Sequence, residues 1–147
     1  MTVSRRRVAV CLAAGLVPWI LVPYEVGLGL VFSVGLVNPG PGPVAFQSVW
    51  GFVRAATRGL PPSLLAWPTA TLLYLTALGS LALALVDRED RRVTAGLFAL
   101  AGLDLVYFAV AFSSARLRVF AVPFGVVLLG LAAWESRPAS WSWLSRG

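Results

Sequence analysis

A single carboxylate lies inside a long apolar stretch, and it is the residue with the clearest potential for chemistry. Asp104 is the only acidic residue between Arg92 and Glu135, and the run from Val93 to Phe112 around it is otherwise apolar apart from a few small or hydroxyl side chains. A charge in the middle of a bilayer costs about 2.5–3.5 kcal/mol on insertion scales, so such a group must face other helices or water, or be protonated. The sequence therefore predicts an intramembrane polar site at Asp104.

Hydroxyl groups are predicted near this carboxylate. If residues 63–86 and 93–112 form an antiparallel helical hairpin about the turn 87–92, Asp104 lies level with Leu75. Side chains three and four positions apart share a helix face, so the Tyr107 hydroxyl of the same helix is expected beside Asp104. The hydroxyl groups expected there are Tyr74, Thr76 and Tyr107.

Three interpretations of Asp104 are possible. The favoured one is a polar clasp, in which a protonated or hydrogen-bonded carboxyl group holds two helices together with about 1–2 kcal/mol. The second is a proton or cation site. The third is an ion pair with Arg116, Arg118 or an arginine of an interfacial helix.

A second candidate contact lies on an amphipathic helix predicted for residues 44–58. Its apolar face contains Phe46 and Trp50, and Arg54 and Arg58 lie on the opposite face. These arginines could bind an anionic lipid headgroup or a phosphate-bearing ligand. A solvated polar face is the simpler interpretation, and it is favoured.

Several chemistries are excluded by the residue types that are missing. The sequence has no lysine and no histidine, so a Schiff base and histidine-ligated metal or haem sites are ruled out. Its single cysteine, Cys11, cannot form a disulfide within the chain. One intramembrane aspartate is too few for a carboxylate dyad, and no phosphate-binding loop is present. We therefore expect no enzyme activity, no cofactor and no metal site.

The composition indicates that these residues are positioned by membrane helices. The 147 residues are 59% hydrophobic and 12% charged, with a mean hydropathy of +0.83. Soluble domains are about 45–50% apolar and about 25% charged. The sequence predicts one all-α membrane domain with four transmembrane helices and an interfacial amphipathic helix between the first two. The spans are expected at about 6–23, 63–86, 93–112 and 117–134, with the interfacial helix at about 44–58 and a non-helical, Gly- and Pro-rich segment over 26–43.

The arginines predict the orientation of this domain. With four spans, eight of the twelve arginines fall on one side and four on the other, which favours cytoplasmic N- and C-termini in the cell membrane. The expected partners are the lipid bilayer and either a second copy or an unidentified membrane protein. Nucleic acid is not expected, because the arginines behind the net charge of +6 lie at the ends of apolar runs.

The densest group of charges is the stretch 87–92. Its three acids and three arginines cancel, so it produces no strong field that would attract a charged ligand. We interpret it as the cytoplasmic turn that sets the register of the hairpin, rather than as a binding site.

Several short motifs resemble those of a known family. They are Gly35-Leu36-Val37-Asn38-Pro39, Arg58-Gly59-Leu60-Pro61-Pro62, Leu65-Ala66-Trp67-Pro68 and Arg88-Glu89-Asp90-Arg91-Arg92-Val93-Thr94-Ala95-Gly96-Leu97. The chain is similar to small four-span membrane proteins of halophilic archaea, whose function is unassigned and whose label refers only to gene neighbourhood near homoserine kinase. The resemblance implies a retained first span, and it brings no catalytic or binding residues.

Two functions follow as expectations. The leading one is a non-enzymatic structural, assembly or accessory component of the membrane. The alternative is a small transporter or a proton- or cation-conducting protein that uses Asp104. A wet polar path past Asp104 would favour the alternative, whereas a carboxylate sealed by hydroxyl groups would favour the accessory role.

Overall fold

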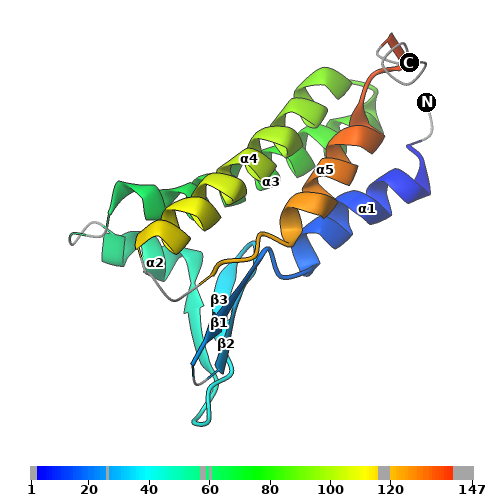
Figure 1. The fold of residues 1–147 in the computed structure, drawn as a ribbon. Helices are drawn as coiled ribbons and strands as arrows, with labels where there is room; N and C mark the ends of the chain where they lie inside the picture. Colours follow the sequence, from blue (N-terminus) through cyan, green and yellow to red (C-terminus); the bar gives the residue numbers. More distant parts are fainter. Residues whose placement is uncertain (1–2, 26, 57–58, 60, 116–119, 141–147) are drawn as a thin grey trace.

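The fold combines helices with a small antiparallel sheet (Figure 1). The computed structural model describes residues 3–25, 27–56, 59, 61–115 and 120–140. The helices are α1 (Arg5–Leu16), α2 (Val49–Ala56), α3 (Ala66–Ala82), α4 (Arg91–Ala115) and α5 (Gly125–Ser136), with 3-10 turns η1 (Pro62–Leu65) and η2 (Leu83–Val86). The strands are β1 (Ile20–Tyr24), β2 (Gly27–Val31), β3 (Gly35–Asn38) and β4 (Ala45–Ser48).

The expected all-α fold with four spans is wrong. Within the described residues, two helical segments are long and apolar enough to cross a membrane, Ser63–Val86 and Arg91–Ser114. These match the second and third expected spans. Helices α1 and α5 have 12 residues each. At 1.5 Å per residue, each is about 18 Å long, whereas the hydrocarbon core is about 30 Å thick.

The first expected span, 6–23, is interrupted by a proline. Pro18 has no N–H group to continue the helix, and α1 ends at Leu16. The chain then becomes extended, and Ile20 pairs with Val31 of β2. β-branched residues favour this conformation. The apolar run that suggests one span thus contains a short helix followed by a strand.

The glycines of residues 27–35 permit close strand pairing. The sheet order is β1-β2-β3-β4, all antiparallel. A Cβ atom on Gly35 would lie 2.4 Å from the ring of Phe46 on β4. A side chain at this position would displace the exposed Phe46 ring. The non-helical conformation predicted for this region is the extended one of β2 and β3.

The amphipathic helix predicted for 44–58 is shorter than expected, and its first part is strand β4. The Ser48 hydroxyl accepts a hydrogen bond from the Gly51 amide at 3.1 Å, as an N-cap residue does, so the helix begins at Val49. Residues 57 and 58, including Arg58, lie outside the described part of the chain.

The fourth expected span, 117–134, is also partly extended. Residues 116–119 lie outside the description, but Val122 forms an isolated antiparallel bridge with Leu21 of β1. Helix α5 begins only at Gly125, whose amide donates to the carbonyl oxygen of Trp19 at 2.8 Å. A Cβ atom on Gly125 would lie 2.7 Å from the Trp19 Cα atom. This close approach joins the start of α5 to the start of β1.

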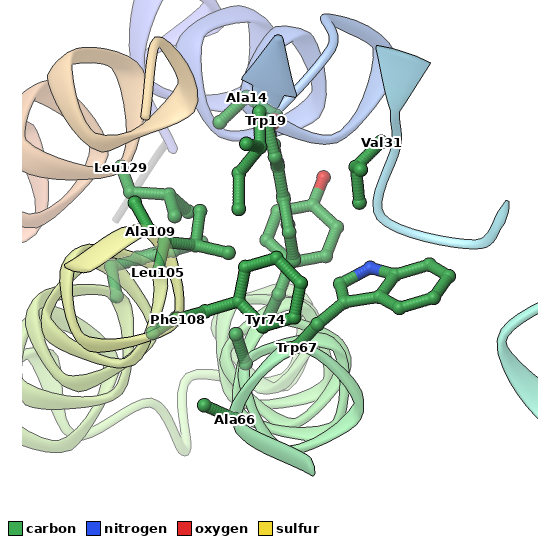
Figure 2. Packing of buried hydrophobic residues seen from close by; sticks show 14 of the residues in the cluster. Ala14, Trp19, Val31, Ala66, Trp67, Tyr74, Leu105, Phe108, Ala109 and Leu129 are labelled. Atoms are coloured by element: carbon green, nitrogen blue, oxygen red, sulfur yellow. Dashed lines mark hydrogen bonds between the residues drawn. The ribbon is translucent and has the colours of Figure 1, made fainter. Parts of the chain in front are cut away.

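The core lies where the helices meet the sheet (Figure 2). Tyr74 of α3 is in edge-to-face contact with Trp19, with ring centroids 5.5 Å apart, and also packs against Phe98 of α4. Leu105 of α4 and Leu129 of α5 are fully buried beside them. α3 packs on α4, α4 on α5 and α5 on α1, whereas the backbones of α1 and α3 make little direct contact. The Tyr74 side chain fills the space between these two helices, where Cys11 and Ala14 are fully buried.

The register of the α3–α4 hairpin differs from the one expected. Asp87 has a left-handed conformation with φ of 53°, which Asp tolerates better than most residues, so the chain reverses before the middle of the charged stretch. As a result Ser80 lies opposite Thr94, with their hydroxyl oxygens 2.7 Å apart. Asp104 therefore lies about one helical turn nearer the start of α3 than the expected level of Leu75.

Candidate functional site

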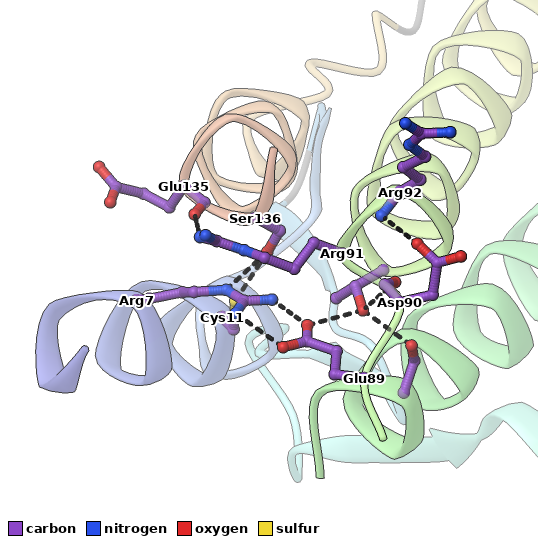
Figure 3. Close-up of polar contacts among 10 residues, drawn as sticks. Arg7, Cys11, Glu89, Asp90, Arg91, Arg92, Glu135 and Ser136 are labelled. Atoms are coloured by element: carbon purple, nitrogen blue, oxygen red, sulfur yellow. Dashed lines mark hydrogen bonds and ion pairs between the residues drawn. The ribbon is translucent and has the colours of Figure 1, made fainter. Parts of the chain in front are cut away.

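A buried ion pair joins the first helix to the turn between α3 and α4 (Figure 3). The Arg7 guanidinium donates through Nη1 to Glu89 Oε2 at 2.9 Å, and its Nη2 contacts Oε1 of the same carboxylate. Their side chains are 6% and 7% exposed. This two-pronged geometry is the strongest form of arginine–carboxylate contact.

The helical spacing of α1 explains why Arg7 points inward. Its buried residues, Arg7, Cys11 and Ala14, are separated by four and then three positions, which places them on one face. Arg5 and Arg6 lie on exposed faces of the same helix. The sequence analysis missed Arg7 because three consecutive arginines look alike until the helix phase is considered.

Hydroxyl groups complete the hydrogen bonding of the ion pair. Thr94 donates to Glu89 Oε1 at 2.9 Å, and Ser80 lies within hydrogen-bond distance of the Thr94 hydroxyl. On the other side, Arg7 Nε donates to the Ser136 hydroxyl of α5 at 3.2 Å. In the described part of the chain, no buried side-chain nitrogen or oxygen lacks a hydrogen-bond partner.

A second layer of contacts surrounds this network toward solvent. Arg6 forms an ion pair with Glu135 at 2.9 Å, and Arg91 Nη2 donates to the Glu135 carbonyl oxygen at 3.2 Å. Asp90 Oδ1 accepts from the Arg92 amide at 2.9 Å, which caps the start of α4. The ends of α1, α4 and α5 are thus tied together by charged groups.

The electrostatics of Glu89 favour its ionised form. Burial alone would raise the pKa of its carboxyl group, but hydrogen bonds from Arg7 and Thr94 and the positive charge of Arg7 outweigh burial. The net effect is a pKa below the usual range. A carboxylate held in this way stays charged and is poorly suited to donate or accept protons near neutral pH.

One pocket is lined by the ion pair, and a second lies next to the first. One has a volume of about 520 Å³ and is lined by Arg7 and Glu89 together with Asp87, Arg91 and Glu135. The other, of about 640 Å³, lies between α1 and η2, where apolar side chains predominate. The charged stretch 87–92 was interpreted from the sequence as a turn only. Its residues Asp87, Glu89 and Arg91 also line the first pocket, and Asp87 lines the second.

The residues predicted around Asp104 are not brought together. Asp104 is half-buried on α4, and the Tyr74 hydroxyl instead donates to the Cys11 carbonyl oxygen of α1 at 2.9 Å. The Thr76 hydroxyl donates to the Leu72 carbonyl oxygen of its own helix. Tyr107 is 57% exposed. A functional role for Asp104 stays a prediction.

The predicted anion contact at the other end of the molecule is only partly described. Arg54 is exposed on α2, which packs near η1 at the start of the α3 segment. Its expected partner Arg58 lies outside the described residues, as do Arg116 and Arg118. Arg54 therefore lies at the opposite end of the α3–α4 hairpin from the ion pair.

The site holds no recognisable metal-binding or catalytic group. Across the described ranges, no three His, Cys, Asp or Glu side chains are grouped so that they could hold a metal ion. The arrangement can bind charged groups and fix helices, but it presents no activated nucleophile.

Comparison with known proteins identifies a family whose function is not assigned. No curated protein matches the chain. Residues 1–143 match a family described as a domain of unknown function (DUF8050). This confirms that the family has no assigned function, as the resemblance to the archaeal proteins implied. With nearly its whole length matched, the chain belongs to the DUF8050 family.

Proposed function

We propose that this protein is a non-enzymatic structural or accessory component of the cell membrane, and that the α3–α4 hairpin crosses the bilayer. The observation that carries the proposal is the low burial of two very apolar helical segments. In Ser63–Val86 and Arg91–Ser114, only 28% and 39% of the residues of the most apolar windows are buried. The core helices of a soluble protein would bury most of such a surface.

The exposed residues of the hairpin are large and apolar. Leu72 and Leu75 of α3 are 55% and 46% exposed, and Leu103 and Val110 of α4 are more than 60% exposed. Water-soluble proteins rarely expose a continuous apolar surface of this kind. Lipid chains would cover it without cost.

The hydrogen bonding of the non-helical backbone supports this placement. A backbone that leaves the helical conformation at membrane depth needs partners within the protein. Where α1 gives way to β1, the Trp19 amide donates to Val31, and Leu21 and Val122 exchange two hydrogen bonds. The junction between helices and sheet is thus internally satisfied.

The arginines support one orientation. Arg7, Arg88, Arg91 and Arg92 lie at the end of the hairpin that also carries both described chain ends, and Arg54 lies at the other end (Figure 1). The positive-inside rule places the arginine-rich end in the cytoplasm. The exposed Trp50 of α2 then lies at the outer surface, where tryptophan is enriched.

The structural role is supported by the ion-pair network. Its charges are mutually compensated and hydrogen-bonded, so it fixes four elements together rather than forming a path for ions.

We also keep membership of the haloarchaeal four-span group as a prediction about the source of the chain, although its four-span topology does not apply here. The transporter alternative through Asp104 has no comparable support.

Membrane fractionation and site-specific labelling test this proposal. Sodium carbonate extraction of isolated membranes should leave the protein in the pellet. In a Cys11→Ala background, Gly40→Cys should react with a membrane-impermeant maleimide in intact cells, because Gly40 lies in open space in the β3–β4 loop. Arg88→Cys should react only after lysis. Release by carbonate, or labelling of both positions in intact cells, would contradict the proposal.

A further inference from the structure

The two pockets near the ion pair share three lining residues. Val3, Ala84 and Asp87 line both of them, so the pockets adjoin along these residues. One pocket has charged walls, and the other is lined mainly by apolar side chains such as Val8, Leu12 and Leu85. A site with a charged part and an apolar part suits an amphiphilic ligand.

The apolar part lies between α1 and η2, beyond the level at which Tyr74 fills the space between α1 and α3. Tyr74 and the Arg7–Glu89 pair are the described side chains that join α1 to α3 and to the turn after it by hydrogen bonds or ion pairs. With the hairpin across the bilayer, this groove faces the lipid on the cytoplasmic half of the membrane.

The charges of the site favour an anionic group. Arg7 and Glu89 compensate each other, and Glu135 is paired with Arg6. Arg91 lines the charged pocket, where it donates to the neutral Glu135 carbonyl oxygen and its charge also acts on Glu89, and exposed Arg5 lines the groove. These two guanidinium groups outnumber the one further carboxylate, that of Asp87. Guanidinium groups bind phosphate with well-defined geometry.

We propose that this combined site binds one phospholipid with an anionic headgroup. Its phosphate lies beside Arg91 and Arg5, and an acyl chain occupies the groove between α1 and η2. The proposal rests on the proposed membrane location, because a lipid reaches the groove only from the bilayer. It predicts a lipid that stays with the protein after extraction, unlike the lipids that merely surround the hairpin.

Lipid titration followed by native mass spectrometry tests the proposal on the purified full-length chain in mild detergent. The probes are phosphatidylglycerol, phosphatidylcholine and free glycerol phosphate. One phosphatidylglycerol should bind per chain, and Arg91→Gln should weaken it about tenfold, as expected for loss of one charge-assisted hydrogen bond. Arg91→Lys should retain most of the binding. Ala9→Trp, which fills the groove from exposed α1, should also weaken binding at least fivefold, by roughly the contact of several methylene groups.

Matched variants separate a specific site from general lipid contact. Arg92→Gln and Ala99→Trp alter exposed residues of α4 that do not line either pocket, and they should bind phosphatidylglycerol as the natural protein does. Equal weakening by these controls, equal binding of phosphatidylcholine, or full competition by free glycerol phosphate would overturn the proposal. A carbonate-resistant protein with no bound lipid would overturn the lipid site alone, whereas carbonate release would overturn the membrane location.

Discussion

The Arg7 guanidinium and the Glu89 carboxylate, 82 positions apart in the sequence, form a two-pronged ion pair that is almost closed to solvent. Each group would be costly to bury alone. The pair therefore couples the position of α1 to that of the α3–α4 turn, because neither can move without exposing or isolating a charge.

Removing one partner should destabilise the protein strongly. Glu89→Gln leaves the Arg7 charge buried without its counter-ion, and we expect a loss of about 3–5 kcal/mol in the free energy of unfolding. Asp90→Asn is the control, because it changes an exposed carboxylate in the same turn to a residue that caps α4 about equally well, and it should cost less than about 0.5 kcal/mol. Denaturant or thermal unfolding in detergent measures both. Equal losses would show that Arg7 does not depend on Glu89.

The double variant Arg7→Leu/Glu89→Leu gives an independent check. Replacing both members of a buried pair by apolar residues is often neutral, so the double variant should be more stable than Glu89→Gln alone. A double variant that is no more stable than the single one would contradict this account of the pair.

Acid should weaken the protein through Glu89. The pKa of Glu89 is lowered in the folded state, so the unfolded chain takes up a proton more readily. The stability that Glu89 contributes is then fully present above the ordinary glutamate pKa of about 4.3, and is lost as the pH falls through the lower folded-state value. Unfolding measured between about pH 7 and pH 3 should show this loss. The Glu89→Gln variant should have a flatter profile over the acid range.

The contact between Trp19 and Gly125 should tolerate no side chain. In Gly125→Ala, the new Cβ atom would lie 2.7 Å from the Trp19 Cα atom, and backbone must move to accept it. We expect a loss of about 1–3 kcal/mol, as for overpacked cores. Gly130→Ala on the same helix has open space around its Cβ position and should be neutral or slightly stabilising, because alanine favours helix. Comparison of the two melting temperatures tests the contact.

Asp104 should be dispensable for folding. Within the described chain it forms no hydrogen bond or ion pair, and it is only half-buried on the apolar helix α4. Asp104→Leu should therefore raise the free energy of unfolding, by about 1 kcal/mol, because a polar group leaves an apolar environment. Leu103→Met, at the exposed neighbouring position, should change little. Destabilisation by Asp104→Leu would support the polar clasp that the sequence predicted.

The sequence revealed the hairpin but not the sheet. The apolar runs that form α3 and α4 are long, their one proline, Pro68, lies in the first turn of α3, and the charged stretch 87–92 separates them, so the local pattern is sufficient to predict both helices. The run through Pro18 has similar hydropathy, but its second part pairs with residues that follow a turn and with Val122 far along the chain. Hydropathy does not record such pairing.

The charged site was missed for a related reason. Glu89 was visible in the sequence within a stretch whose charges sum to zero, and such a sum hides which individual charges are buried. One signal was available. The spacing of Arg7 with Cys11 and Ala14 places it on a helix face of small residues, whereas Arg5 and Arg6 lie off that face. The pairing of Arg7 with Glu89 across the fold required three-dimensional information.

The 12-residue length of α1 also sets the order in which the protein can be assembled. At about 18 Å, α1 is shorter than the hydrocarbon core of a bilayer. Its binding surfaces are the Glu89 carboxylate and helix α5, both of which follow it in the chain. Helix α1 therefore completes its native contacts only after α5 has been made, and a chain that stops before α5 leaves Arg7 without the Ser136 hydroxyl and Trp19 without its contact with Gly125.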